Sequence, residues 1–281
     1  MVNGKSILIT GCSSGIGKSA AFTLQSRGYQ VIASVRKPED IVTLLEEGIE
    51  HVIHLDLQST ESIESAITET LKITGGQLYA LFNNGAYGQP GAVEDLTRET
   101  LLKQFQTNVF GTHELTVKIL PYLTKDDSRI IQNSSILGFV SMPMRGAYNA
   151  SKHALEGLTD TLRIELSETN TKISIIQPGP IKTDFRKNAL IALEDNVDIT
   201  KSRHQSRYEG ALTRLKKVGA ASRFTLGPES VVNKVIHALE SERPKVRYKV
   251  TFPTYFLALI KPIFPARVFD KVLMASAKSE G

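Results

Sequence analysis

Short apolar runs alternate with longer stretches of helical periodicity along most of this chain, and this alternation limits the fold more than any other feature. The apolar runs, each as long as one buried strand, cover residues 5–10, 29–35, 51–55, 78–82, 129–133 and 173–177. The helical patterns between them cover residues 15–27, a stretch that follows Ser59 and stops at Gly75, residues 99–123 and residues 147–167. Strands joined in this way by amphipathic helices form a parallel sheet with helices on both faces. The sequence therefore predicts an α/β fold with a doubly wound parallel sheet.

The length and the even composition favour one domain over two. A chain of 281 residues is near the upper limit for a single hydrophobic core. No repeat, low-complexity linker or change of composition marks a boundary, and residues 228–240 and 246–251 extend the pattern by a helix and a strand. Residues 1–281 are thus expected to form one domain. The polar segment of about residues 184–226 is expected to be irregular, either as a lid over a ligand or as a tolerated surface insertion.

The cysteine count and the absence of certain sequence patterns exclude several classes of function. The chain has 34 basic and 29 acidic side chains, a net charge of +5 and one cysteine. One cysteine excludes a disulfide framework and fits a reducing compartment, so a cytoplasmic location is predicted. No apolar run reaches the length of a membrane span, and the run at residues 7–9 is too short for a signal peptide. No cluster of metal ligands and no aromatic-and-basic stripe is present, so neither a metal site nor nucleic-acid binding is expected.

A glycine-rich turn separates the first expected strand from the first helix. Residues 10–18 read Thr-Gly-Cys-Ser-Ser-Gly-Ile-Gly-Lys. Glycines at such a junction allow a tight turn, so that a pyrophosphate can approach the N–H groups at the start of the helix. A glycine turn that binds nothing is the alternative. Cys12 in this turn is either a thiol whose pKa the helix end lowers or a small residue that the turn tolerates.

The spacing T-G-x-x-x-G-x-G resembles the short-chain dehydrogenase/reductase superfamily, whose members have a Rossmann fold. The resemblance covers residues 4–185 well and the remainder weakly. It implies binding of a nicotinamide dinucleotide by the residues of the turn. These are Gly11, Ser13, Ser14, Gly15, Ile16 and Gly17.

The end of the second expected strand bears on which nucleotide is bound. Family members that use NAD have an Asp there, which binds the ribose 2′-hydroxyl. This chain has Arg36 and Lys37 instead, and both suit a 2′-phosphate, with Lys18 as a further candidate. The sequence therefore favours NADP(H) over NAD.

Three further segments match the family in order along the chain. Asp56 and Leu57 stand where the family contacts the adenine ring. Residues 83–86 read Asn-Asn-Gly-Ala where the family has Asn-Asn-Ala-Gly, and residues 178–183 resemble its Pro-Gly-x-x-x-Thr segment beside the nicotinamide. The resemblance implies that Asn83, Gly85, Pro178, Gly179, Ile181 and Thr183 also contact the cofactor.

Tyr148 and Lys152 lie four residues apart in an expected helix and hence on one face of it. A phenol has a pKa near 10, and a neighbouring ammonium group lowers that value by stabilising the phenolate. Such a pair can protonate an alkoxide as hydride reaches a carbonyl. By itself the pair fits an ordinary amphipathic helix equally well.

Ser135 and Asn108 complete the family's Asn-Ser-Tyr-Lys tetrad in the expected order. The resemblance implies that Tyr148 is the acid in reduction and the base in oxidation. It also implies that Lys152 lowers the pKa of Tyr148 and holds the nicotinamide ribose, so both residues also contact the cofactor. Ser135 is implied to bind the substrate carbonyl, and Asn108 to position a water. The side chain of Ser134 should point to the opposite face of its strand.

Residues 146–157 read Gly-Ala-Tyr-Asn-Ala-Ser-Lys-His-Ala-Leu-Glu-Gly and most resemble the 17β-hydroxysteroid and retinol dehydrogenase-like group. The resemblance implies an NADP(H)-dependent oxidoreductase for a hydrophobic carbonyl or alcohol, such as an aldehyde, a ketone, a steroid or a retinoid. The alternative is a non-catalytic NADP-binding regulatory protein, since a fold alone does not confer activity. An epimerase-type relative would have a T-G-x-x-G-x-x-G turn, which the chain lacks.

The carboxyl-terminal tail, residues 252–281, is apolar in its first part, with Lys261, Arg267 and Lys271 interspersed. It can complete the core, close the substrate pocket or make a weak contact with a membrane surface. Core packing or pocket closure is favoured, because membrane docking normally needs a larger and cleaner apolar face. The two longest helical patterns correspond to the family's dimer interface, so a homodimer or homotetramer is expected.

Overall fold

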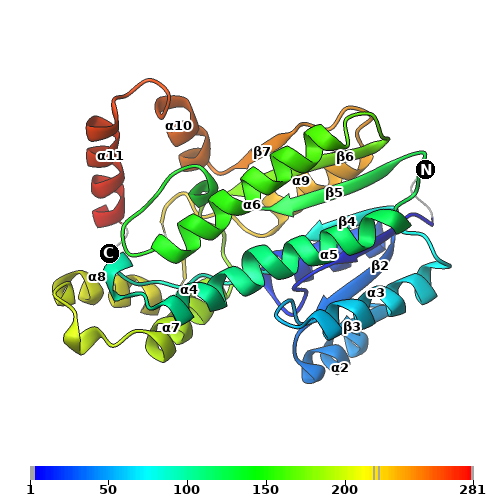
Figure 1. The fold of residues 1–281 in the computed structure, drawn as a ribbon, viewed down its shortest axis with the longest axis horizontal. Coiled ribbons are helices and arrows are strands. Elements are labelled where there is room, and N and C mark those ends of the chain that lie inside the picture. The colour runs from blue at the N-terminus through cyan, green and yellow to red at the C-terminus, as the bar shows by residue number, and fades with distance from the viewer. Residues whose placement is uncertain (1–3, 218, 221, 280–281) are drawn as a thin grey trace.

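The fold is described from a computed structural model for residues 4–217, 219–220 and 222–279 (Figure 1). Its strands are β1 (Ser6–Ile9), β2 (Gln30–Val35), β3 (His51–His54), β4 (Ala80–Asn83), β5 (Ser128–Asn133), β6 (Thr171–Pro178) and β7 (Arg247–Val250). All pairings are parallel, in the order β3-β2-β1-β4-β5-β6-β7. The predicted doubly wound parallel sheet is therefore confirmed, with each strand within two residues or so of its expected position.

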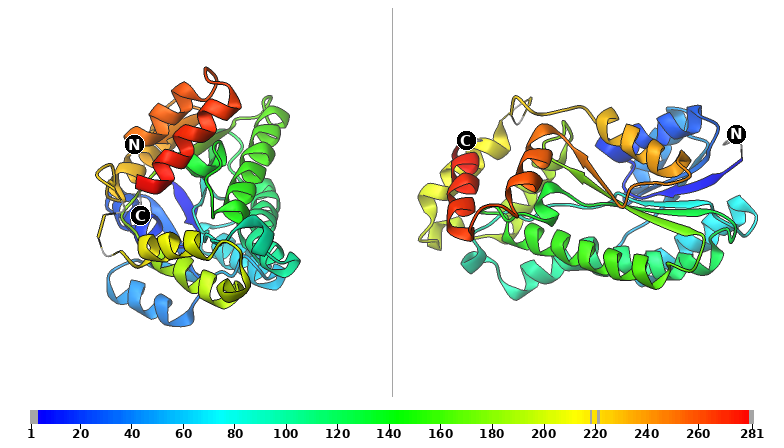
Figure 2. Two further views of the ribbon diagram at one scale, coloured as in Figure 1. Left: turned by 90° about the vertical axis from the view of Figure 1, so that its left-hand side faces the viewer. Right: turned by 90° about the horizontal axis from the view of Figure 1, so that it is seen from above.

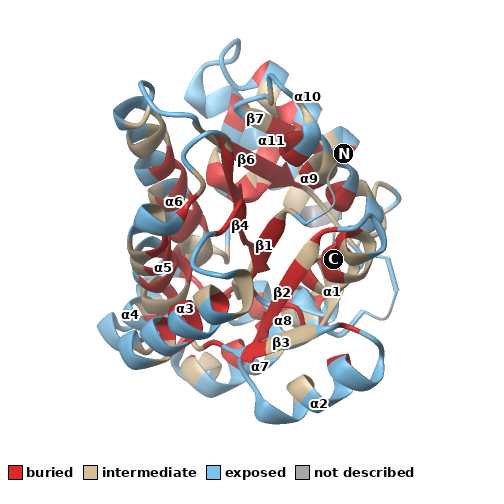
Figure 3. Ribbon diagram, turned by 90° about the vertical axis from the view of Figure 1, so that its right-hand side faces the viewer, coloured by how far each residue is buried: buried red, intermediate tan, exposed pale blue. Residues whose placement is uncertain are grey.

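Helices cover both faces of this sheet, and each face has its own apolar core (Figure 3). One face carries α1 (Gly15–Ser26), α2 (Pro38–Glu46) and α9 (Glu229–Glu240). The other carries α3 (Thr60–Thr74), α5 (Thr112–Ile119) and α6 (Gly146–Glu165). Because both faces are covered, the central strands are apolar without alternation, and Ile7, Leu8 and Ile9 are all fully buried.

Helix ends follow local chemistry that the sequence already indicates. The Ser59 side chain accepts a hydrogen bond from the Ser62 backbone N–H and so caps α3. At the other end of α3, Gly75 adopts a left-handed conformation with φ of 69°.

The helix expected over residues 99–123 is not continuous. It divides into α4 (Arg98–Phe105), a π-helical turn (Gln106–Gly111) and α5. At the end of the π turn the backbone passes so close to Leu57 that a Cβ on Gly111 would lie 1.8 Å from the Leu57 carbonyl oxygen. Such π turns occur often at functional sites, and this one contains Asn108.

The segment of residues 184–226 contains two helices, so the expectation of an irregular insertion is wrong. They are α7 (Phe185–Asn196) and α8 (Gln205–Lys216). Their buried sides form a small separate core that includes Leu193, Tyr208 and Leu215. The Tyr208 hydroxyl donates to Asp95 at 2.7 Å and accepts from the Ala92 N–H at 2.9 Å. The polar composition reflects the solvent-facing sides of these helices.

The tail forms two more helices, α10 (Phe252–Ile260) and α11 (Ala266–Ser279), at one end of the molecule (Figure 2). Their buried residues pack against Leu137, Val140 and Met142, which follow β5. Short 3-10 turns cover Val93–Asp95, Leu120–Tyr122, Ile136–Gly138 and Ile199–Lys201. Among the described residues, no helix is both long and apolar enough to cross a membrane.

Candidate active site

The candidate site lies at the carboxyl ends of the strands, where the strand order reverses. The first strand, β1, is paired with β2 on one side and β4 on the other. Connections from β1 and β4 therefore leave in opposite directions and open a crevice between them, which is where ligands bind in sheets of this kind. The glycine turn after β1 and the Asn-Asn-Gly segment after β4 both border this point.

The turn after β1 is held in shape by the chain itself. The Thr10 hydroxyl oxygen accepts hydrogen bonds from the N–H groups of Asn84 at 2.9 Å and Gly85 at 2.7 Å. Gly11 has a φ of +71°, and a Cβ there would lie 2.8 Å from the Gly85 Cα. A Cβ on Gly17 would lie 2.1 Å from the Gly11 carbonyl oxygen. Glycine at these positions thus lets two loops close against each other.

The start of α1 fits a phosphate group. Ser14 occupies the cap position but makes no side-chain capping bond, and the first turn of α1 contains no acidic residue. By contrast, Ser59 and Thr97 cap α3 and α4 with their side chains. Uncapped N–H groups at a helix N-terminus favour an anionic ligand. The residues at this turn therefore fit the pyrophosphate of a dinucleotide.

The Pro-Gly-x-x-x-Thr segment after β6 packs onto the same turn. A Cβ on Gly15, whose φ is +58°, would lie 2.9 Å from the Cγ2 atom of Thr183. Gly179 is held by a bond from its N–H to the Val250 carbonyl, and Ile181 packs against the core beside α1. Thr183 is thus positioned between the glycine turn and the beginning of α7.

The basic residues after β2 differ in how they are engaged. The Arg36 and Lys37 side chains are exposed, and Lys37 makes only a long 3.8 Å contact with Glu39. Lys18 instead forms a 2.6 Å ion pair with Glu47, beyond the end of α2. Arg36 and Lys37 therefore remain the candidates for a 2′-phosphate, whereas the suggestion that Lys18 helps is not supported.

One of the other expected cofactor residues, Asn83, is placed differently from expectation. Asn83 is buried and its amide donates to the Thr116 hydroxyl at 2.8 Å, so its side chain faces α5 and away from the crevice. The next residue, Asn84, faces the turn and donates to the Thr10 and Gly11 carbonyls at 3.0 and 3.2 Å. Successive side chains along a strand point to opposite faces, so Asn84 and not Asn83 is the asparagine whose side chain faces the glycine turn.

Asp56 and Leu57 follow β3. A carboxylate oxygen of Asp56 accepts the Gln58 N–H at 2.9 Å, and this turn leaves the side chain partly exposed at the edge of the crevice. Leu57 is buried beneath the π turn.

Tyr148, Lys152 and Ser135 come together in the structure. A hydrogen bond joins the side chains of Tyr148 and Ser135. The Lys152 ammonium nitrogen lies 5.8 Å from the centre of the Tyr148 ring and donates to the Asn133 carbonyl at 2.7 Å. The Ser134 hydroxyl points away, to Glu156 at 2.6 Å, as the strand alternation predicts.

Burial controls the proton affinities of this group. It raises the pKa of Tyr148 to about 12, and the hydrogen bond with Ser135 only partly opposes the effect. It also lowers the pKa of Lys152 to about 8, with the charge of Glu156 opposing. That Lys152 lowers the Tyr148 pKa stays a prediction, because the shift in this structure comes from desolvation, which acts in the opposite direction. Tyr148 is a neutral phenol at neutral pH, ready to donate a proton.

The side-chain amide of Asn108 is bonded to residues on both sides of the candidate site. Its Oδ1 atom accepts the Tyr87 N–H at 3.2 Å, and its Nδ2 atom donates to the Tyr87 carbonyl at 2.9 Å and to the Ser151 hydroxyl at 3.2 Å. The buried amide therefore ties the segment after β4 to α6, the helix that carries Tyr148 and Lys152.

Glu156 is a buried carboxylate that the sequence analysis missed. It lies one turn after Lys152 on α6 and accepts bonds from Ser134 at 2.6 Å and from the Gln177 amide at 2.9 Å. Arg247 forms an ion pair with it at 3.4 Å. Its spacing of four residues from Lys152 was the available signal, since that spacing puts both groups on one face of the helix.

Cys12 is fully buried, and its thiol contacts the Ile9 carbonyl at 3.3 Å. Burial raises its pKa to about 12. A thiol with so high a pKa is a poor nucleophile, so Cys12 is a packing residue of the turn.

The fold, the glycine turn after β1 and the arrangement of Tyr148, Lys152 and Ser135 are those of an oxidoreductase that uses a dinucleotide. Residues 5–193 match the short chain dehydrogenase family, and the chain belongs to that family. It is 43% identical to the uncharacterized oxidoreductase YbbO of Escherichia coli K12 over 96% of this chain and 94% of YbbO. It is 31% identical to the NADPH-dependent 3-dehydrocapnine reductase of Ornithobacterium rhinotracheale over 96% of both chains. A short-chain dehydrogenase of Burkholderia phymatum solved with NAD has the same fold, with a TM-score of 0.77, 23% identity and 92% of each chain covered.

Proposed function

We propose that this protein is an NADP(H)-dependent oxidoreductase that transfers hydride between the nicotinamide and a hydrophobic carbonyl or alcohol. The observation that carries the proposal is the meeting of Tyr148, Ser135 and Lys152 at the carboxyl end of the sheet, beside an uncapped helix start. A bound NADPH would supply the hydride. The chain's own residues would hold the substrate and supply the proton.

The two hydroxyls would act on the substrate oxygen. Tyr148 and Ser135 are already within hydrogen-bonding distance of each other, so one carbonyl oxygen can accept from both. With a pKa raised to about 12, the Tyr148 phenol carries its proton throughout the neutral range, and an alkoxide, which is more basic still, can take that proton during reduction. Lys152, held by Asn133, would orient the ribose and stabilise the phenolate that donation leaves.

The preference for NADP(H) rests on Arg36 and Lys37. Both side chains are exposed at the end of β2, the position where a carboxylate would bind an unmodified ribose. Guanidinium and ammonium groups bind phosphate with charge-assisted hydrogen bonds. The relative that reduces 3-dehydrocapnine with NADPH supports the same choice.

Apolar walls around Tyr148 support a hydrophobic substrate. The Tyr148 ring packs against an apolar cluster formed by the loop after β5 and by α10 and α11. On another side, the Phe185 ring meets it edge-on with centroids 5.3 Å apart. A carbonyl carrying an extended apolar group would gain contacts with these rings that a small polar ketone cannot make.

The test is a screen for oxidation of NADPH, with NADH in parallel, over long aliphatic aldehydes, ketosteroids, retinal and small polar ketones. We expect turnover with at least one hydrophobic carbonyl and a lower KM for NADPH than for NADH. NADPH binding without turnover of any carbonyl would instead favour the non-catalytic regulatory alternative. Faster turnover of the small polar ketones would contradict the hydrophobic substrate.

The proposal also includes a homodimer or homotetramer in a cytoplasmic setting. Exposed apolar side chains line the outer surface of α5, α6 and the π turn before them, and such a surface is typical of a subunit interface. They include Phe110, Val117, Leu158 and Ile164. Light scattering of the purified protein tests this assembly, which a monomer at micromolar concentration would contradict.

A further inference from the structure

Helix α10 has two apolar faces, and the fold uses only one of them. Thr254, Leu257 and Ile260 point inward and are buried. Phe252, Tyr255, Phe256 and Leu259 have the i, i+3, i+4, i+7 spacing of a single helix face, and all four are exposed. Ile263 continues the same spacing beyond the helix end. Leu259 is 67% exposed and Ile263 66%, so these side chains contribute little to the core.

The exposed face is part of a larger concentration of apolar side chains. Of the 21 large apolar side chains exposed in the described part of the chain, eight lie between residues 252 and 274. The rings of Phe252 and Phe256 stack with centroids 5.9 Å apart, and the Phe224 ring also stacks with that of Phe252, at 5.2 Å. Figure 1 shows the α10–α11 pair standing out from the body of the molecule. Because Phe252 is 61% exposed and Phe256 43%, a flat surface can reach these rings.

The charged residues near this face are mostly basic. Residues 252–269 contain Lys261 and Arg267 and no Asp or Glu. Lys261, Arg267 and Lys271 are exposed at the end of α10 and on α11, and Asp270 is the one acidic residue between 252 and 274. An apolar face of Phe, Tyr and Leu flanked by basic residues has the composition of an interfacial helix on an anionic bilayer.

We propose that the exposed face of α10, continued by Ile263 and Phe264, docks on the surface of an anionic lipid bilayer. The apolar side chains enter the headgroup boundary while Arg267 and Lys271 meet lipid phosphates. A bilayer is favoured over a second copy of the chain because pairing this face with itself would bring two basic clusters together. The larger and cleaner apolar face that the sequence alone did not reveal is thus present.

Docking would place the membrane next to the candidate site. The inner side of α10 belongs to the same apolar cluster as Leu137 and the Tyr148 ring. One helix therefore separates the docked face from the catalytic group. Delivery of a hydrophobic substrate from the bilayer rests on the proposed function, but docking itself does not, so it is measured without substrate.

The experiment is cosedimentation of the full chain with phosphatidylcholine vesicles, with and without about one-third phosphatidylserine. We expect binding to the anionic vesicles, weakening with added salt, and little binding to the neutral ones. Leu259→Ser with Ile263→Ser should weaken binding by about tenfold or more, because two buried aliphatic contacts are lost. Val42→Ser with Leu45→Ser removes two exposed apolar side chains from α2 and serves as the matched control.

Arg267→Gln with Lys271→Gln tests the charge component and should weaken binding to the anionic vesicles only. Thermal melts and NADPH binding establish that each variant is folded. Absent vesicle binding, equal binding to both compositions, or an equal loss in the α2 control would each overturn the proposal. So would light scattering in which Leu259→Ser with Ile263→Ser splits an oligomer, since the face would then bind a second copy.

Discussion

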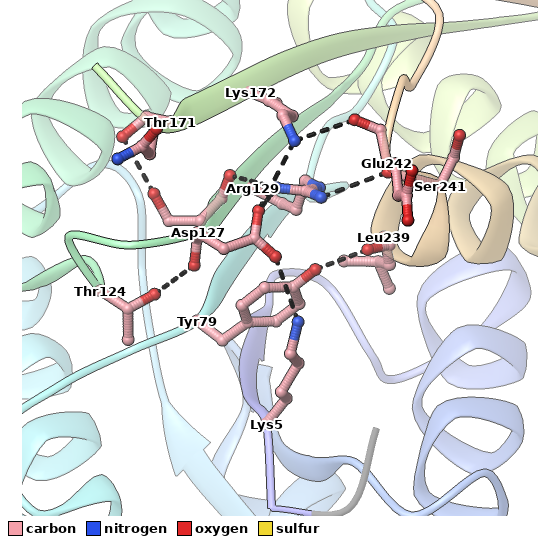
Figure 4. A network of polar contacts seen from close by, with 12 residues as sticks. Lys5, Tyr79, Thr124, Asp127, Arg129, Thr171, Lys172, Leu239, Ser241 and Glu242 are labelled. Carbon is pink, nitrogen blue, oxygen red and sulfur yellow. Dashed lines mark hydrogen bonds and ion pairs between the residues drawn. The ribbon is translucent and has the colours of Figure 1, made fainter. Parts of the chain in front are cut away.

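The two ends of the sheet both carry charged groups, but they hold them in opposite ways. At the amino ends of the strands, Asp127 is paired with Lys5 and Arg129 and lies 3.8 Å from Lys172 (Figure 4). The cavity there has a volume of about 610 Å³, and its wall carries four basic and four acidic side chains. At the carboxyl ends, the buried Lys152 ammonium donates to a neutral carbonyl, and its pKa falls to about 8.

This difference in charge pairing indicates that the catalytic groups lie at the carboxyl ends of the strands. Paired charges stabilise one another and leave few unpaired groups to bind a ligand. The amino-end network therefore has a structural role, in which it joins β1, β5, β6 and the end of α9. The buried Lys152 ammonium, beside the Tyr148 phenol, has a pKa near the pH range where enzymes work. The cavity at the amino ends therefore does not mark the site, whereas charge balance selects the end that the sequence motifs also mark.

The largest expected effect comes from removing the Tyr148 hydroxyl. Tyr148→Phe should lower kcat/KM by about 10²–10⁴-fold, the usual contribution of a positioned acid, while NADPH binding is retained. Steady-state kinetics and NADPH fluorescence measure the two properties separately. Retained turnover would remove Tyr148 from its proposed role and weaken the contrast between the two ends.

The fold was predictable because buried parallel strands are apolar runs bounded by glycine and polar residues, as at residues 5–10. The helices of residues 184–226 were not predictable from the sequence, because each has few buried residues and the helical spacing of these is obscured by the polar side chains between them. The sequence analysis assigned Asn83 to the cofactor, but the side chain of Asn84 is the one that faces the crevice. Which of two adjacent asparagines does so depends on the register of the strand, which the sequence does not show. The pKa of Tyr148 depends on desolvation, which only three-dimensional packing creates.

Arg36→Asp should give the next largest effect. It replaces a group that can bind a 2′-phosphate with one that repels it, so the preference for NADPH over NADH should fall by about ten- to hundredfold. The ratio of kcat/KM values for the two nucleotides is the measurement. Arg243→Asp, an exposed change near the amino end, should leave the ratio unaltered; an equal response in both variants would point to net charge rather than a specific contact.

Arg129→Met should separate stability from function at the amino end. Arg129 is 3% exposed and bonds to Asp127 and to the carbonyls of Ser128 and Ser241. Its loss should cost about 1–3 kcal/mol in the free energy of unfolding. Denaturant unfolding and the kcat of the folded fraction are the two readouts. An altered KM for nucleotide with unchanged stability would reverse the assignment of roles to the two ends.

Glu156→Gln should have the smallest effect, on pH dependence. Turnover in the reducing direction is expected to fall as pH rises through about 8, where Lys152 loses its charge. The Glu156 carboxylate favours the charged ammonium, so its removal lowers the Lys152 pKa and moves this fall to lower pH. Glu156→Asp should restore the profile, and Glu165→Gln at the exposed end of α6 should not shift it. An unmoved profile in Glu156→Gln would limit Glu156 to packing.

The central claim is that this site transfers hydride to a carbonyl, and an isotope label tests it most directly. NADPH carrying deuterium on one or the other face of its reactive nicotinamide carbon is incubated with the protein and the best hydrophobic carbonyl from the screen. Mass spectrometry of the alcohol should show one deuterium on the former carbonyl carbon with one of the two labels and none with the other. Alcohol without deuterium from either label, or no alcohol at all, would contradict the account.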